Sequence, residues 1–192
     1  MTALDFFARW RVRLGYILAI VVLFLARPTP LSLILGAIVG APGLAVRAYA
    51  AGFLHKKEIL TTSGPYAHTR NPLYFGSSAL AAGVAIATHS WWAAALILVY
   101  FALVYTLVMR REEGELRTKH GPAFDAYAAR VPLFFPRLTP SAAAAPVTSG
   151  PGAQQIPAFS WQQYKTNHEY QAALGFVLLL LALLLIWHFR AR

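Results

Sequence analysis

The sequence has no cysteine and few acidic residues, and both shortages exclude classes of protein. Among 192 residues there are seven Asp and Glu against seventeen Lys and Arg. Without cysteine, the chain cannot be a secreted domain held by disulfide bonds, and it cannot build a zinc site from thiolate ligands. The six histidines show no spacing typical of metal ligands. We therefore expect no metal site.

Charged residues of either sign are scarce, and long apolar stretches replace them. Charged residues make up 12% of the chain and hydrophobic residues 58%, which excludes a disordered chain. Five apolar stretches cover approximately residues 10–26, 31–51, 73–88, 91–109 and 172–188. A bilayer core needs roughly 20 helical residues, with about 17 tolerated. The sequence predicts an all-α integral membrane protein with five transmembrane helices, the first retained rather than cleaved.

The basic residues predict the orientation of these helices. If the N-terminus is cytoplasmic, 14 of the 17 Lys and Arg lie on the cytoplasmic side, and only Arg27, Arg190 and Arg192 lie on the other. The net charge of +10 is then explained by topology and by contact with anionic lipid headgroups. We expect membrane lipids and no nucleic acid as partners, and the cytoplasmic membrane of a prokaryote as the location.

Composition divides the chain into three parts. Residues 1–137 contain four of the predicted spans and are expected to form the core, with a GxxxG pattern at Gly36 and Gly40 that indicates close helix packing or, alternatively, a kink that opens a ligand cavity. Residues 138–160 are rich in Ala, Pro, Gly, Ser and Thr, as in a flexible linker. Residues 161–192 are predicted to be an accessory C-terminal transmembrane helix.

Five of the seven acids fall in two polar segments, residues 55–76 and 110–137. In the first, Gly64-Pro65 predicts a turn, and Pro72 suits the first turn of the third span. Tyr66, Arg70 and Asn71 would then lie at a helix N-terminus, which favours anionic groups. An interfacial belt of aromatic and arginine side chains is the alternative. The second segment is expected to continue the fourth span as a charged helix, in which Glu112 and Glu113 follow Arg110 and Arg111. A solvated face is the alternative.

These two segments resemble the isoprenylcysteine carboxyl methyltransferases and their bacterial relatives, which overlap the phospholipid methyltransferases. The resemblance covers residues 45–137 and rests on the motifs Gly64-Pro65-Tyr66, Arg70-Asn71-Pro72-Leu73-Tyr74-Phe75-Gly76, Glu112-Glu113-Gly114-Glu115-Leu116 and Arg130-Val131-Pro132. Asn71 stands where the family has His, Phe124 where it has the first Tyr, and His120 where it has Phe. These departures weaken the transfer of detail more than the class.

The resemblance implies a cytoplasmic pocket for S-adenosylmethionine between the two segments, which agrees with the absence of a soluble-type GxGxxG motif. By resemblance, the cofactor is bound by Leu60, Tyr66, Asn71, Pro72, Tyr74, Glu112 and Glu113. A lipophilic acceptor would enter from the bilayer.

Methyl transfer to a carboxylate needs alignment and desolvation but no general base. Three arginines are candidates to orient such a carboxylate: Arg70, Arg110 and Arg111. The leading hypothesis is therefore methylation of a prenyl-like carboxylate such as isoprenylcysteine. Alternatives are methylation of a phospholipid amine, which requires a base, a nicotinamide-dependent reductase of sterol-type substrates, and a membrane scaffold without catalytic activity.

Overall fold

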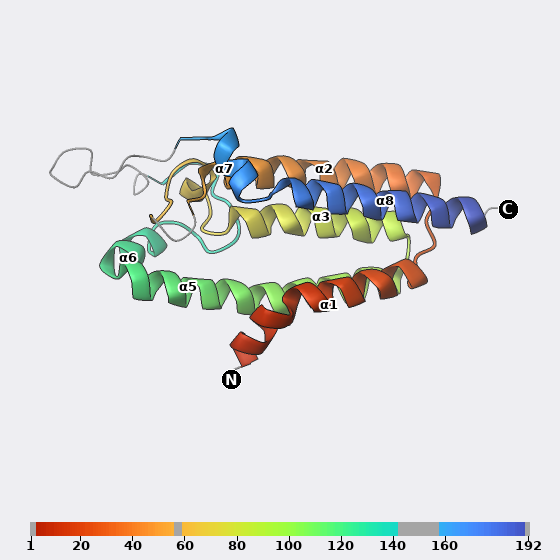
Figure 1. Cartoon of the computed structure of the whole chain (residues 1–192), viewed down its shortest axis with the longest axis horizontal. Coiled ribbons are helices and arrows are strands. Elements are labelled where there is room, and N and C mark those ends of the chain that lie inside the picture. The colour runs from red at the N-terminus through yellow and green to blue at the C-terminus, as the bar shows by residue number, and fades with distance from the viewer. Residues whose placement is uncertain (1–2, 56–58, 142–157, 191–192) are drawn as a thin grey trace. The chain divides into compact units, whose positions relative to one another are not determined.

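The computed structural model describes residues 3–55, 59–141 and 158–190, and within these residues every regular element is a helix (Figure 1). Three helices are long and apolar enough to cross a membrane: Pro30–Phe53, Trp91–His120 and Tyr170–Arg190. Two shorter apolar helices, Arg13–Leu25 and Pro72–Thr88, correspond to the other two predicted spans. The prediction of an all-α integral membrane protein is confirmed. Glu58 and most of the predicted linker lie outside the described residues.

The helices of the first three predicted spans begin or end at prolines or short polar caps. Helix α1 (Ala3–Leu25) ends before Arg27-Pro28, and α2 (Pro30–Phe53) begins at a proline and contains Pro42. The α2 N-terminus is closed reciprocally, because the Thr29 amide donates to Ser32 Oγ and the Ser32 amide donates to Thr29 Oγ1, at 2.9 and 3.1 Å. Helix α3 (Pro72–Thr88) begins at Pro72, as predicted.

The fourth predicted span and the polar segment after it form one continuous helical stretch. Ser90 caps α4 (Trp91–Tyr100) by accepting from the Ala93 amide, and a π-helical turn, η2 (Phe101–Tyr105), leads into α5 (Thr106–His120). Gly121 has φ +52° and separates α5 from α6 (Pro122–Ala128). The stop that Gly121-Pro122 predicts is therefore present. In residues 158–190, α7 (Trp161–Thr166) precedes α8 (Tyr170–Arg190).

The chain divides into two compact units, and the first consists of apolar helix segments. It comprises Met1–Leu44, Ser77–Glu112 and Ala172–Arg192. A methyl group built on Gly36 would lie 2.5 Å from the carbonyl oxygen of Gly83, and one built on Gly40 would lie 2.2 Å from the Phe176 ring. These glycines thus allow α3 and α8 to approach α2 closely, which confirms the packing interpretation of the GxxxG pattern.

The second unit comprises Ala45–Gly76 and Glu113–Gln171, and it contains most of both polar segments. One of its hydrophobic clusters is formed by Ala50, Phe53 and Tyr66. The other is formed by Phe124, Tyr127 and Val131, with Leu60 packed against it. Each cluster joins residues from distant parts of the sequence, so the polar segments fold into one body with its own small core.

Candidate functional site

The site is built around the Gly64-Pro65-Tyr66 turn, which forms a short 3-10 helix, η1 (Gly64–Ala67). Gly64 has φ +58°, and a methyl group built on it would lie 2.7 Å from the Phe53 ring. Both the backbone conformation and the lack of space therefore require glycine here. Pro65 begins the turn, and Tyr66 behind it is buried. The turn fixes the direction in which the chain approaches residues 69–71.

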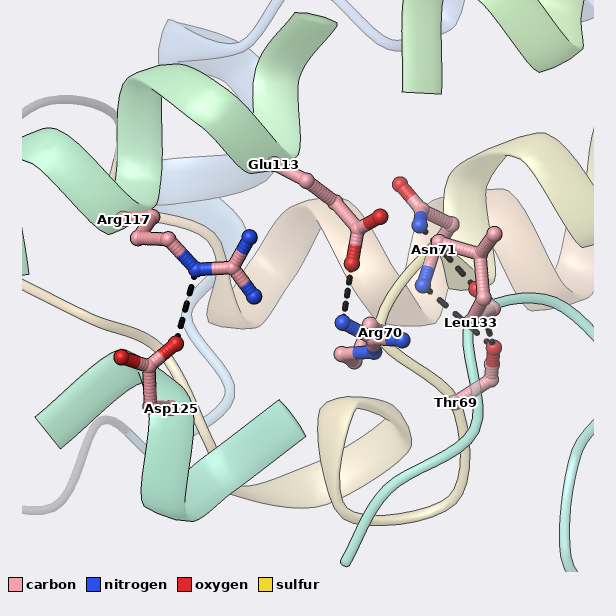
Figure 2. A network of polar contacts seen from close by, with 7 residues as sticks. All are labelled: Thr69, Arg70, Asn71, Glu113, Arg117, Asp125 and Leu133. Atoms are coloured by element: carbon pink, nitrogen blue, oxygen red, sulfur yellow. Dashed lines mark hydrogen bonds and ion pairs between the residues drawn. The ribbon is translucent and has the colours of Figure 1, made fainter. Parts of the chain in front are cut away.

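Residues 69–71 are held against the chain segment that follows α6 (Figure 2). The Arg70 amide donates to Pro132 O at 2.9 Å, Asn71 Nδ2 donates to Leu133 O at 3.0 Å, and Thr69 Oγ1 donates to Phe134 O at 2.9 Å. Thr69 is 2% exposed, and its hydroxyl also accepts from the Asn71 amide at 3.3 Å. The end of the second polar segment thus fixes the conformation immediately before α3.

Arg70 and Glu113 form an ion pair between the two polar segments, within the second unit. Their side chains are 15% and 21% exposed, so water screens the pair only partly. Figure 2 shows Glu113 reaching from α5 to the Arg70 guanidinium. Arg70 Nε is buried and has no hydrogen-bond partner among the described residues. A buried donor of this kind can bind an acceptor from a ligand.

A buried tyrosine joins α6 to the η1 turn. Tyr127 Oη donates to the carbonyl oxygen of Tyr66 at 2.7 Å. Burial raises the pKa of the Tyr127 hydroxyl above that of a free tyrosine, and the positive charge of Arg70 opposes this effect. The hydroxyl therefore keeps its proton and remains a donor across the physiological range.

A second charged pair in this region is exposed. Arg117 Nε donates to Asp125 Oδ1 at 2.7 Å, and the two side chains are 59% and 57% exposed. Pairs as exposed as this contribute little to stability. The solvated-face interpretation therefore fits Arg117 and Asp125, but it does not fit Glu113, which is turned to Arg70.

Most of the residues predicted for the site belong to the second unit, namely Leu60, Tyr66, Arg70, Asn71, Pro72, Tyr74 and Glu113. Pro72 is buried, while Asn71 and Tyr74 are half-buried. The other three, Arg110, Arg111 and Glu112, directly precede Glu113 on α5 and belong to the first unit. Arg110 is exposed, and Arg111 and Glu112 are half-buried.

The sequence did not predict two side chains that hold this arrangement together, Thr69 and Tyr127. Thr69 has no motif of its own, and only its place directly before Arg70 could have suggested a role. Tyr127 lies within residues 45–137, which carry the resemblance, but its hydrogen bond to the backbone carbonyl of Tyr66 could not be predicted from the sequence. Among the described residues, no group of three or more His, Asp or Glu side chains could hold a metal ion.

A comparison with known proteins supports the resemblance in part, because the family that matches is one of the two named in the sequence analysis. The family model described as "Phospholipid methyltransferase" matches residues 33–122. This range includes the whole first polar segment and α5, with Arg70 and Glu113. Across these residues the chain is similar to the phospholipid methyltransferase family.

Two curated relatives are similar over part of their length. The nickel-cobalt-cadmium resistance protein NccN of Alcaligenes xylosoxydans xylosoxydans is 42% identical over 84 residues, 44% of this chain and 39% of the relative. The cobalt-zinc-cadmium resistance protein CzcN of Cupriavidus metallidurans is 34% identical over 137 residues, 68% of this chain and 63% of the relative. The chain thus spans less than two thirds of either relative. No solved structure matches it.

Proposed function

We propose that this chain is an integral membrane methyltransferase that uses S-adenosylmethionine to methylate a lipophilic acceptor. The observation that carries the proposal is the Arg70–Glu113 pair, with residues 69–71 held against residues 132–134. Both members of the pair lie in the residues that match the phospholipid methyltransferase family. A solvated face or an aromatic belt does not require a shielded arginine with a free buried donor.

The chemistry of these side chains fits the proposed cofactor. Its amino-acid part carries a carboxylate and an ammonium, which match the buried Nε of Arg70 and the carboxylate of Glu113 or its neighbour Glu112. Leu60 and Tyr66 offer apolar surface for the adenosine part, and Asn71, Pro72 and Tyr74 would line the other side. When bound, S-adenosylmethionine supplies a methyl group activated by its sulfonium. The chain needs to orient the acceptor and exclude water.

The leading acceptor is a prenyl-like carboxylate such as isoprenylcysteine. A carboxylate has no proton to remove, and the guanidinium groups of Arg70, Arg110 and Arg111 are the groups suited to orient it. The second candidate is a phospholipid amine, which the description of the matching family favours. An amine acceptor would need Glu113 or a nearby histidine to accept a proton.

The test is incubation of the purified protein with total membrane lipid and methyl-labelled S-adenosylmethionine. Label that base releases indicates an ester and supports the carboxylate acceptor. Stable label on a headgroup amine supports the phospholipid acceptor instead. If no lipid is labelled and S-adenosylhomocysteine does not bind in calorimetry, the chain is not a methyltransferase, and binding of NADPH in its place would support the reductase hypothesis.

A further inference from the structure

A segment from near the C-terminus is docked onto the end of α2 within the second unit. The Phe159 ring covers Gly52, where an added methyl group would lie 2.3 Å from a ring carbon. The Ser160 amide donates to the carbonyl oxygen of Gly52 at 3.0 Å. Phe159 also stacks on Tyr49, with ring centroids 6.0 Å apart. The contact therefore combines apolar packing with a backbone hydrogen bond.

The same segment supplies hydrogen-bond donors to carbonyls at the end of α2 and directly after it. Asn167 Nδ2 donates to the carbonyl oxygens of Ala51 and Leu54, both at 2.8 Å. Gln163 Nε2 also donates to Leu54 O, at 2.7 Å. The last carbonyls of a helix have no partner within the helix. Residues 158–169 thus cap α2 where the chain leaves it for the first polar segment.

Glu169 extends this docking to the start of α3. Its side chain is 8% exposed and forms an ion pair with Arg47 of α2. Arg47 Nη1 also donates to the carbonyl oxygen of Leu73 at 3.3 Å, in the first turn of α3. A buried carboxylate is costly unless it is paired. The pair therefore holds Arg47 in the orientation in which it reaches Leu73.

We propose that Glu169 is a positioning residue for the cofactor site. It fixes Arg47, and Arg47 fixes the turn of α3 that contains Pro72 and Tyr74, two of the proposed cofactor-binding residues. This inference rests on the proposed function. Glu169 lies outside residues 33–122, which match the methyltransferase family, so the C-terminal segment adds to the site a residue that the matched region does not contain.

The test is the variant Glu169→Gln, which keeps the size of the side chain and removes its charge. We expect its affinity for S-adenosylhomocysteine, measured by calorimetry in detergent below its melting temperature, to fall by about tenfold, as for residues that act through neighbours. Hydrogen exchange of the cofactor-free protein should become faster at residues 73–77. The exposed Lys165→Gln in the same segment is the control and should change neither quantity.

A second variant keeps the proposal testable if Glu169→Gln does not fold. Arg47→Lys retains a cation for Glu169, but it lacks the two-nitrogen fork with which Arg47 reaches Glu169 through Nη2 and Leu73 O through Nη1. It should weaken cofactor-product binding in the same way, while Glu169→Asp should restore part of the affinity that Glu169→Gln loses.

The outcomes separate this inference from the proposed function. If the wild-type protein does not bind S-adenosylhomocysteine, the proposed function fails, and faster exchange at residues 73–77 would leave Glu169 with a structural role only. If the wild-type protein binds and both variants bind equally well, the positioning role is wrong even where the exchange changes.

Discussion

At the scale of single residues, several separate contacts constrain Arg70. It pairs with Glu113, its amide bonds to Pro132, and its Nε remains a buried donor among the described residues. Lysine could replace the charge but not the fork of donors. The geometry therefore favours a role that depends on the guanidinium rather than on positive charge alone.

The first prediction concerns this dependence. Arg70→Lys should weaken the binding of S-adenosylhomocysteine by about 1–3 kcal/mol, the usual cost of a lost charge-assisted bond, and should reduce methyl transfer. Calorimetry and the labelling assay measure the two effects. Arg130→Lys, at an exposed position after α6, is the control. Equal affinity in Arg70→Lys and the wild type would exclude Arg70 from cofactor binding, and equal methyl transfer would also exclude it from orienting the acceptor.

A second residue-scale prediction follows from Tyr127. Tyr127→Phe leaves the carbonyl of Tyr66 without this donor, so we expect a loss of about 1–3 kcal/mol in unfolding free energy. Because burial raises the pKa of Tyr127 in the folded state, the stabilisation is complete below about pH 10 and declines as pH rises further. Thermal melts should show a steeper alkaline decline in the wild type than in Tyr127→Phe, and identical declines would contradict this.

At the scale of elements, glycine determines how closely the apolar helices of the first unit approach each other. The space beside Gly36 is bounded by the backbone of Gly83, whereas the space beside Gly40 is bounded by the ring of Phe176. A ring can rotate away from an added methyl group, but a backbone carbonyl in a packed helix cannot. Gly36 should therefore be the less tolerant position.

This difference gives the third prediction. Gly36→Ala should destabilise the protein by about 1–3 kcal/mol through overpacking, seen as a lower melting temperature in detergent. Gly114→Ala is the matched control, because no atom lies within 4 Å of an added methyl group there, and it should be neutral or stabilising by about 0.5–1 kcal/mol. Equal melting temperatures for the two variants would contradict close packing of α2 and α3.

The helices could be predicted from the sequence better than the contacts between segments. Pro72 and Gly121-Pro122 act locally, so the start of α3 and the end of α5 follow from the residues themselves. The π-helical turn η2 and the Arg70–Glu113 pair have no local signature, because they depend on tertiary packing. Glu169 and Arg47 are 122 positions apart in the sequence, so their contact could not be predicted from residue spacing.

At the scale of the whole molecule, the distribution of charge predicts the orientation in the membrane, and the absence of cysteine makes that orientation testable. Fourteen of seventeen basic residues fall on one side of the predicted topology, and the cofactor site is proposed for that side. A cytoplasmic site is chemically sensible, because a charged cofactor cannot cross a bilayer core unaided. The predicted orientation is therefore a condition of the proposed function.

The fourth prediction tests this orientation with single cysteines, which the cysteine-free chain accepts without background. Thr139→Cys, an exposed position after the second polar segment, should react with a membrane-impermeant thiol reagent only after the cells are permeabilised. Trp91→Cys and His188→Cys, both exposed, should react in intact cells. The cysteine-free parent is the control for labelling of other proteins. Labelling of Thr139→Cys in intact cells would contradict the predicted topology, because the basic residues would then face away from the cytoplasm. The proposed site would also lie on the side of the membrane without cofactor.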